Sequence, residues 1–393
     1  MNPTDHVTDT IRYIGVDDND IQLFENQYPV PKGISYNSYL VHGSEASMIF
    51  DTVDSRRLDS WKELVETAVK EDGREPAYIV MLHAEPDHTG GIVWALQRFG
   101  EIRLVASQMC LNMLAQFYGE GIPADRTIPV KEGSVIDLGD RTLTFHTASM
   151  IHWPEVMVAV DSKDEVLFSA DAFGRFGSLG YGDDSWDAEA RRYYTNIVGK
   201  YGSQVQNLLK KLSADKISII ASLHGPVLRD NLQHYGSLYN LWSSYTPELP
   251  DGVLIAYASI YGGTERVALR AADMLRERGV EVAIIDLCRQ DASEAVSQAF
   301  RMGRMLLASV TYDAGLFPAM NNFLYRIASK GLRGRRVALI ENGTWSPIAA
   351  KAMRQQLEAM KDMEVVEPAV TVRSAAAPST DEALQALIDA LMA

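Results

Sequence analysis

Four side chains of types that bind metal ions stand within six residues of one another, directly after a short apolar segment. The segment, residues 77–82, is followed by His83-Ala-Glu85-Pro-Asp87-His88 and then by Thr-Gly-Gly. An apolar run of this length predicts a buried strand, and the glycines let the chain turn after it. Imidazoles and carboxylates without a thiolate suit iron or manganese. The cluster therefore predicts a metal site at one edge of a sheet.

Three more candidate ligands stand where an apolar run gives way to a glycine or proline turn. They are His152, Asp171 and His224, in the stretches Ser-Met-Ile-His-Trp-Pro, Ser-Ala-Asp-Ala-Phe and Ser-Leu-His-Gly-Pro. Taken singly, each could be a turn residue whose polar atoms are satisfied locally, and His146 and His234 are assigned to that structural class. These three residues are candidate metal ligands because of their order along the chain and their context, not because of any single residue.

A second constellation follows the apolar run at residues 253–258. It consists of Ser259, Ile260, Tyr261, Gly262, Gly263 and Thr264, with a helix expected to begin near the last of these. Glycines let backbone N–H groups approach a phosphate, and a helix N-terminus offers unpaired donors. The loop is neither a P-loop nor a GxGxxG turn. A plain capped helix uses the same residue types, so this loop alone leaves both interpretations open.

Two further polar turns follow predicted strands of the same half. They contain Thr311, Tyr312, Asp313, Ala314 and Gly315 in the first turn, and Asn342, Gly343, Thr344, Trp345 and Ser346 in the second. Ligands of doubly wound sheets bind beyond the carboxyl ends of the strands, where these turns would meet. Tyr312 and Trp345 could flank a flat ring, whose polar rim the backbone could bind. Together the three turns favour a mononucleotide over a dinucleotide.

The elements that must position these residues differ between the two halves. The first half predicts strands at 35–41, 46–51, 77–82, 103–106, 141–148, 156–161, 165–169 and 217–221, with helices at 60–70 and 187–211. The segment 245–252, with two prolines and a glycine, breaks regular structure. Beyond it, strands at 253–258, 281–286, 304–310, 336–341 and 365–370 alternate with helices beginning near 264, 292, 319, 347 and 380. Strict alternation predicts a doubly wound parallel sheet, and we expect domains at 1–248 and 249–393.

Composition narrows the classes of partner. A formal net charge of −15 argues against nucleic acid as a partner, because binding to phosphate backbones uses clustered Lys and Arg. Cys110 and Cys288 are isolated, which excludes a disulfide framework and fits a reducing cytoplasm. The polar N-terminus has no signal-like apolar region, and no apolar run is long enough for a bilayer. Because the chain ends at Ala393, soon after the last predicted helix, we expect no further fused domain.

The order of these motifs resembles that of the flavodiiron proteins. The run His83-x-Glu85-x-Asp87-His88 is followed by His152, Asp171 and His224, and then by a flavodoxin-like loop. The resemblance covers essentially the whole chain. It implies an N-terminal metallo-β-lactamase-like αββα sandwich and a C-terminal flavodoxin-like doubly wound sheet. Gly263 departs from the flavodoxin pattern, which often has a polar residue there.

The resemblance also implies the cofactors and the reaction. One iron would be held by His83, Glu85 and His152, a second by Asp87 and His224, and Asp171 would bridge them. His88 matches a position that binds the second iron in some members and turns away in others. FMN would occupy the three turns of the second domain. The implied activity is reduction of dioxygen to water, of nitric oxide to nitrous oxide, or both, with metal ligands as the only catalytic residues.

Partners follow from the same resemblance. The implied electron donor is external: rubredoxin, a flavin reductase or reduced coenzyme F420. The implied assembly is a head-to-tail homodimer or a dimer of dimers, which would bring the FMN of one chain to the irons of the other.

Two other functions stay open. A zinc hydrolase of the β-lactamase-like fold, with an accessory flavodoxin domain, is the first. Glu85 counts against it, because hydrolytic members carry a second His at that position and a carboxylate favours oxidised iron. The second is a redox or gas sensor without turnover, against which the complete ligand set weighs.

Overall fold

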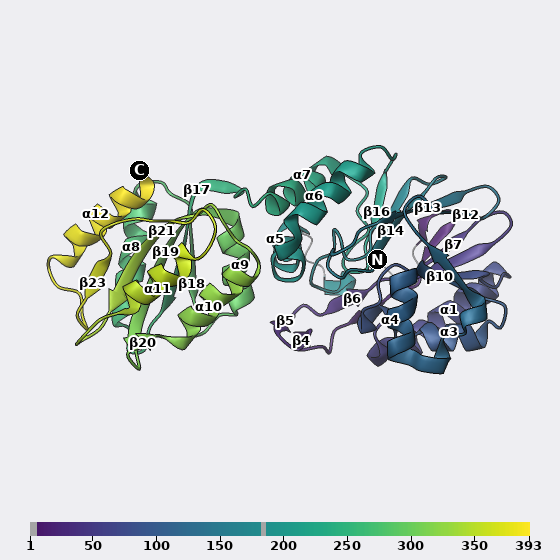
Figure 1. Cartoon of the computed structure of the whole chain (residues 1–393), viewed down its shortest axis with the longest axis horizontal. Helices are drawn as coiled ribbons and strands as arrows, with labels where there is room; N and C mark the ends of the chain where they lie inside the picture. The colour runs from purple at the N-terminus through teal and green to yellow at the C-terminus, as the bar shows by residue number, and fades with distance from the viewer. Residues whose placement is uncertain (1–5, 182–185) are drawn as a thin grey trace. The chain divides into compact units, whose positions relative to one another are not determined.

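The computed structural model describes residues 6–181 and 186–393 (Figure 1). The chain divides into two compact units. The first runs to Tyr194 and includes Ser203–Asn240, and the second combines Thr195–Gly202 with Leu241–Ala393. The expected boundary after residue 248 thus lies a short way inside the second unit. No helix in the described ranges is both long and apolar enough to cross a membrane.

The first unit is built on two mixed sheets. The larger has the strand order β1 (His6–Thr8), β2 (Ile11–Tyr13), β7 (Tyr39–His42), β8 (Ser47–Phe50), β9 (Tyr78–Met81), β10 (Arg103–Ser107) and β11 (Thr127–Val130). The smaller has the order β12 (Val135–Asp137), β13 (Thr142–Thr147), β14 (Met157–Asp161), β15 (Val166–Phe168) and β16 (Ile219–Ala221). Two short pairs accompany them, β3 (Val16–Asp18) with β6 (Ile34–Tyr36), and β4 (Leu23–Phe24) with β5 (Tyr28–Pro29).

The two sheets pack face to face through aromatic side chains. Phe50 of β8 stacks on Phe168 of β15, with ring centroids 4.0 Å apart. Tyr39 of β7 meets the same ring edge-on at 5.6 Å. All three side chains are buried, so the apolar faces of both sheets form one core.

Helices flank these sheets. They are α1 (Leu58–Asp72), α2 (Pro86–Thr89), α3 (Ile92–Arg98), α4 (Gln108–Tyr118), α5 (Trp186–Tyr193), α6 (Gly202–Leu212) and α7 (Leu232–Ser243). Helix α1 shows why they form: Trp61, Val65 and Ala68 share its buried face, and Gly73 ends it at a φ of 64°. Helix α4 is capped by Ser107, whose hydroxyl accepts the Cys110 N–H.

Two elements predicted in the first half of the sequence are interrupted. The strand expected at 35–41 breaks between β6 and β7, because the Asn37 side chain turns away and donates to the carbonyls of Ser222 and Gly225. The helix expected at 187–211 contains a π turn at Tyr194–Val198 and a 3-10 turn at Gly199–Tyr201. A Cβ on Gly202 would lie 2.2 Å from the Ser243 carbonyl oxygen, so close chain contact shapes this region.

The second unit is a parallel sheet covered on both faces. Its strands run in the order β18 (Val282–Asp286), β17 (Leu249–Ala258), β19 (Met302–Tyr312), β21 (Arg336–Asn342) and β22 (Glu364–Val365). Strand β23 (Val370–Val372) also pairs with β21, and the short β20 (Gly315–Leu316) pairs with β19. In sequence order this is 2-1-3-4-5, the flavodoxin-like doubly wound arrangement.

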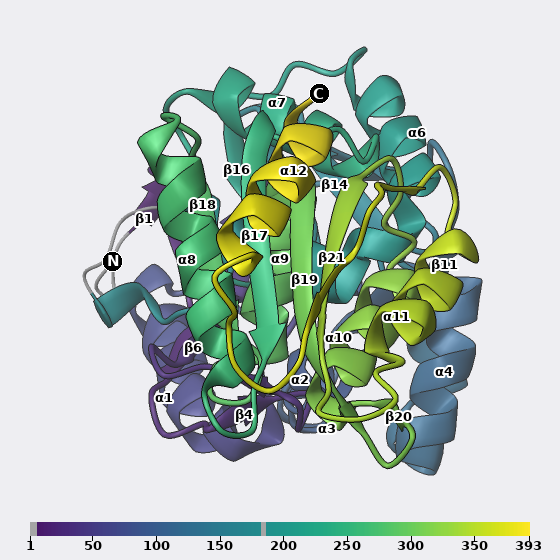
Figure 2. The ribbon, with the colours of Figure 1, turned by 90° about the vertical axis from the view of Figure 1, so that its left-hand side faces the viewer.

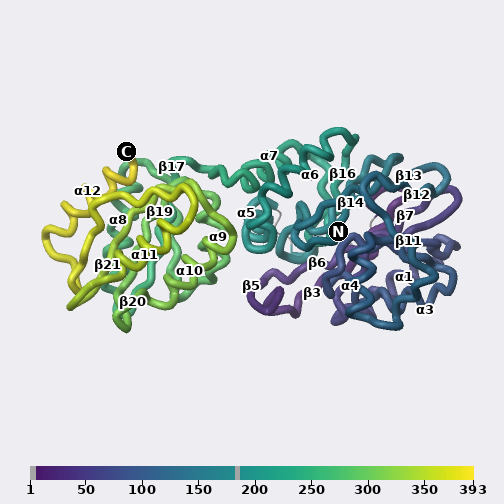
Figure 3. The backbone as a smooth tube through the Cα atoms, viewed as in Figure 1, coloured from purple at the N-terminus to yellow at the C-terminus, as the bar shows by residue number. Residues whose placement is uncertain are grey.

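Helices on the two faces bury separate apolar clusters. They are α8 (Gly263–Glu277), α9 (Ala292–Arg301), α10 (Pro318–Ser329), α11 (Ala349–Glu358) and α12 (Thr380–Met392), and Figure 3 traces their alternation with the strands. One cluster joins the strands to α8 and α12, which lie together in front of the sheet in Figure 2. The other joins them to α9, α10 and α11. The fifth predicted strand, at 365–370, is split because Pro368 lacks the N–H that a ladder needs.

Candidate metal centre and ligand pocket

Strand ends and one short helix position the candidate ligands of the first unit. His83 and Glu85 follow β9, and α2 presents the next two candidates. His152 lies in the turn between β13 and β14, Asp171 follows β15, and His224 follows β16. Each apolar strand therefore ends in a polar side chain, and sheet packing brings these ends together.

The seven side chains fall into two groups. The first contains His83, Glu85, His152 and Asp171, and the second contains Asp87, His88 and His224. Within each group the nitrogen and oxygen atoms that could bind a metal lie within 4.8 Å of one another. All seven predicted ligands are thus brought together, and their binding of metal stays a prediction.

Asp171 faces both groups. Its Oδ2 lies 3.5 Å from His83 Nε2 and 3.2 Å from His152 Nε2. Its Oδ1 lies 3.2 Å from His88 Nε2 and 3.8 Å from His224 Nε2. A carboxylate whose two oxygens face different ligand sets has the arrangement of a bridge between two ions.

The other two carboxylates each serve one group. Glu85 Oε2 lies 3.1 Å from His83 Nε2 and 3.0 Å from His152 Nε2. Asp87 Oδ1 lies 3.5 Å from His88 Nε2, and its Oδ2 lies 3.5 Å from His224 Nε2. His88, whose orientation was open in the sequence, therefore directs Nε2 into the second group.

Several of these polar atoms are buried without a hydrogen bond. Within the described chain they are both carboxylate oxygens of Asp87, both ring nitrogens of His88, Oδ1 of Asp171 and Nε2 of His224. An unsatisfied buried polar atom costs about 1–3 kcal/mol, so a ligand that satisfies several such atoms at once would stabilise this cluster. Nitrogen and oxygen donors without sulfur fit a pair of iron or manganese ions.

The charges of the cluster also fit the binding of cations. Burial disfavours every charge here, yet the imidazoles of His88 and His152 hold the pKa of Asp171 well below its usual value. Burial is likewise outweighed by Asp87 and Asp171, which raise the pKa of His88 to about 9. Protons on the imidazoles thus balance the carboxylates in this cluster, and divalent cations could take their place.

The turns that aim the ligands are conformationally strained. Met150, Ala170 and Phe173 have φ angles of 67°, 50° and 66°, which residues other than glycine seldom adopt. The ring of Phe173 stacks on Tyr239 at 4.1 Å, and its N–H donates to the Tyr239 hydroxyl. Packing of this kind holds the turn around Asp171 in place.

Sequence reasoning missed two oxygen atoms that contact the Nδ1 atoms of candidate histidine ligands. Glu155 Oε1 lies 2.7 Å from His83 Nδ1 and accepts the Ala84 N–H at 2.9 Å. The Ser35 carbonyl oxygen lies 2.7 Å from His224 Nδ1. Glu155 stands three residues after His152, so its acidic type was the available signal. The Ser35 carbonyl carries no signal in the sequence.

A small cavity opens beside Glu85 of the first group and Asp87 of the second. It measures about 290 Å³, and its lining includes Phe24, Tyr36, Glu85 and Asp87. The ring of Phe24 meets His224 edge-on at 5.4 Å. Pockets for drug-sized ligands start at roughly 300 Å³, so this cavity suits a small molecule.

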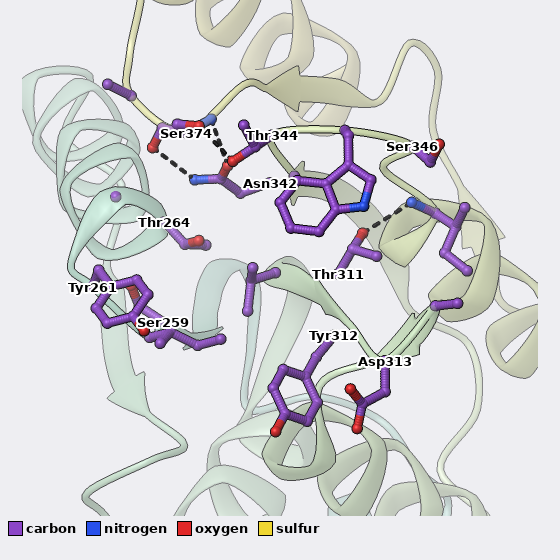
Figure 4. Close-up of a pocket in the computed structure, with 18 of the residues that line it drawn as sticks. Ser259, Tyr261, Thr264, Thr311, Tyr312, Asp313, Asn342, Thr344, Ser346 and Ser374 are labelled. Carbon is purple, nitrogen blue, oxygen red and sulfur yellow. Dashed lines mark hydrogen bonds between the residues drawn. The ribbon is translucent and has the colours of Figure 1, made fainter.

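A larger pocket lies at the carboxyl edge of the sheet in the second unit (Figure 4). It measures about 800 Å³. The turn residues predicted from the sequence line it, except Gly262 and Gly315. Residues that the sequence did not indicate also line it: Arg266, Val310, Ile348, Ser374 and Ala375.

Ser374 belongs to a fourth turn, which follows β23. Its N–H donates to Asn342 Oδ1 at 3.0 Å, and its hydroxyl lies 2.7 Å from that of Thr344 (Figure 4). Its carbonyl oxygen would lie 2.4 Å from a Cβ on Gly263. The glycine at this position is therefore required by close approach of another turn, which replaces the polar side chain of the flavodoxin pattern.

Thr311 has a second role besides lining the pocket. Its Oγ1 accepts the N–H groups of Ile348 at 2.9 Å and Ala349 at 3.1 Å, at the start of α11. The turn after β19 is thereby tied to the turn after β21.

Three aromatic side chains at the mouth of this pocket are exposed to solvent. Tyr261, Trp345 and Tyr312 are 94%, 80% and 44% exposed. Exposed aromatic side chains in one place indicate a binding surface, and flat rings suit a flat ligand.

Comparisons with known proteins cover both units. Residues 34–225 match the family model of the ODP family beta lactamase. An anaerobic nitric oxide reductase flavorubredoxin from Vibrio vulnificus is 27% identical over 90% of this chain and 73% of its own length. An oxidase of reduced coenzyme F420 from Methanothermobacter marburgensis is 28% identical over 84% of this chain and 82% of its own.

A solved structure matches the whole chain. It is a variant of the flavo di-iron protein from Thermotoga maritima, 25% identical, with a TM-score of 0.87 over 99% of this chain and 98% of that one. Over its whole length the chain is therefore similar in fold to a flavodiiron protein. The expected fold of such a protein, a metallo-β-lactamase-like sandwich followed by a flavodoxin-like sheet, is confirmed.

Proposed function

We propose that this chain is a flavodiiron protein, an oxidoreductase that reduces dioxygen to water, nitric oxide to nitrous oxide, or both, at a pair of non-haem iron ions. FMN relays the electrons from an external donor. The observation that carries the proposal is Asp171, which directs one oxygen to each group of candidate ligands. The names of two similar proteins support the proposal: one is called a nitric oxide reductase and the other an oxidase.

The residues divide between the two ions as follows. His83, Glu85 and His152 would hold one ion, Asp87, His88 and His224 would hold the other, and Asp171 would contribute an oxygen to each. An iron pair supplies a place where a small oxidant binds and is polarised, and FMN supplies stored electrons. Glu85 adds negative charge where an imidazole would be neutral. The small cavity beside Phe24 and Tyr36 limits what reaches the ions.

FMN would occupy the pocket of the second unit. The N-terminus of α8 together with the hydroxyls of Ser259 and Thr264 binds its phosphate, because unpaired N–H groups and hydroxyls are donors. Tyr312 and Trp345 flank the flat ring system. A volume of about 800 Å³ is sufficient for a mononucleotide of this size.

Electrons come from a separate protein or cofactor, such as rubredoxin, a flavin reductase or reduced coenzyme F420. A head-to-tail homodimer, alone or as a dimer of dimers, brings the FMN of one chain to the irons of its partner. The cytoplasm is the proposed compartment, since Cys110 and Cys288 are both free thiols.

Rapid mixing tests the function. The iron- and FMN-loaded protein is reduced without oxygen and mixed with dioxygen or nitric oxide, while flavin absorbance is followed. We expect rapid reoxidation of the flavin, slowed by about 100-fold or more in Asp171→Asn, since even residues behind metal ligands contribute 10–100-fold. Asp137→Asn, on the surface strand β12, serves as the matched control. Equal rates in wild type and Asp171→Asn would show that the flavin reacts without the metal site.

A further inference from the structure

The two groups of ligands differ in what stands behind their histidines. Glu155, whose side chain is fully buried, accepts from His83 Nδ1 in the first group. In the second group, His224 Nδ1 meets the carbonyl of Ser35, a neutral acceptor. A carboxylate behind a metal-binding imidazole fixes its tautomer and makes it a stronger donor than a carbonyl does. The first group therefore has the better supported histidine.

His88 in the second group has no such support. Its Nδ1 is buried and has no hydrogen-bond partner in the described parts of the chain. Both carboxylate oxygens of Asp87 lack one as well. No hydrogen bond to another group behind them fixes the orientation of these two side chains in the described ranges.

Negative charge is also distributed unequally. The first position is near the carboxylates of Glu85, Asp171 and Glu155, whereas the second is near Asp87 and the shared Asp171. The buried carboxylate of Asp51 interacts with one histidine of each position, His88 and His83, so it does not remove the difference. Charges in a buried site interact more strongly than in water. Access to solvent does not offset this difference, because the side chains of Glu85 and Asp87 are 14% and 11% exposed.

We propose that the two metal positions are unequal, and that the position of His83, Glu85 and His152 keeps its ion longer than the position of Asp87, His88 and His224. Glu155 is the positioning residue that strengthens the first position. This inference rests on the proposed function, because it requires both positions to be filled.

Iron release measures the inequality directly. The reduced holoprotein is mixed anaerobically with an excess of a chromophoric chelator of ferrous iron, and absorbance is followed. We expect two phases, each releasing one equivalent of iron per chain. A single phase that releases both equivalents would overturn the proposal.

Variants of Glu155 assign the slow phase. Glu155→Gln keeps an oxygen for His83 Nδ1 but removes the charge, so the slow phase should accelerate by about 10-fold while the fast phase stays unchanged. Glu155→Asp keeps the negative charge. Its slow phase should therefore be slower than that of Glu155→Gln and closer to that of the wild type. A fast phase that accelerates instead, or a slow phase that does not change, would contradict the assignment.

A matched control is available in the same unit. Glu132 Oε1 lies 2.8 Å from His146 Nδ1, the same contact outside both ligand groups. Glu132→Gln should leave both phases unchanged, and an effect equal to that of Glu155→Gln would show that the change is not specific to the metal position.

His88→Asn tests the other position independently. It should accelerate the fast phase alone, so the proposal stays testable if Glu155→Gln does not fold. Acceleration of the slow phase would reverse the assignment. Fewer than two irons per chain in the active protein would contradict the proposed function, whereas two irons released in one phase would contradict only this inference.

Discussion

At the scale of single residues, chemistry depends on where a few side chains end up. The run from His83 to His88 could be identified from residue types and spacing, because an apolar strand places them at a sheet edge. Glu155 and the Ser35 carbonyl could not. Ser35 and His224 are 189 residues apart, and only packing of the chain brings them together.

Gly263 gives a prediction at this scale. A Cβ there would lie 2.4 Å from the Ser374 carbonyl oxygen. Gly263→Asn, which restores a polar residue common in flavodoxin loops, should therefore displace the Ser374 turn and weaken FMN binding by about 10-fold, corresponding to the lower end of overpacking costs of 1–3 kcal/mol. Quenching of FMN fluorescence on titration into flavin-free protein measures the affinity.

Gly236→Ala provides the control for this substitution, because a Cβ at Gly236 meets nothing within 4 Å. It should leave FMN affinity unchanged. Tighter binding by Gly263→Asn would show that the added amide contacts the phosphate and that the Ser374 turn moves away at little cost.

At the scale of elements, the alternation of strands and helices after residue 253 was predicted well, because buried parallel strands and amphipathic helices have distinct patterns. The failures have tertiary causes. The strand expected at 35–41 yields to contacts of Asn37 with the turn at Ser222. The turn at Ser374 was missed because the predicted fifth strand ended at residue 370, whereas β23 reaches Val372.

Helix α11 gives the prediction at this scale. The Thr311 hydroxyl accepts two N–H groups at its start. Thr311→Val should lower the free energy of unfolding of this unit by about 1 kcal/mol, as loss of a helix cap does, and should weaken FMN binding because the Trp345 turn leads into the same helix. Chemical denaturation followed by circular dichroism measures the first effect, and FMN titration the second.

Thr311→Ser is the conservative comparison, since it keeps the hydroxyl. It should restore most of both properties. If Thr311→Val lowers FMN affinity without any change in stability, the hydroxyl contacts the flavin instead of acting through the helix.

At the scale of the whole molecule, the proposed function requires two candidate sites in two separately packed units. The metal site assembles from strand ends and turns spread from His83 to His224, so it exists only in the folded first unit. The pocket assembles from four turns at one edge of the second sheet. Both candidate sites form at sheet edges, from the turns that follow the strand ends.

The central claim is that seven side chains of the first unit bind two irons bridged by Asp171. Anomalous diffraction at the iron absorption edge, on crystals of the purified protein, tests it most directly. The account predicts two iron peaks, one within the group of His83, Glu85 and His152 and one within the group of Asp87, His88 and His224, with Asp171 between them. A single peak, or a site that contains zinc and no iron, would contradict it.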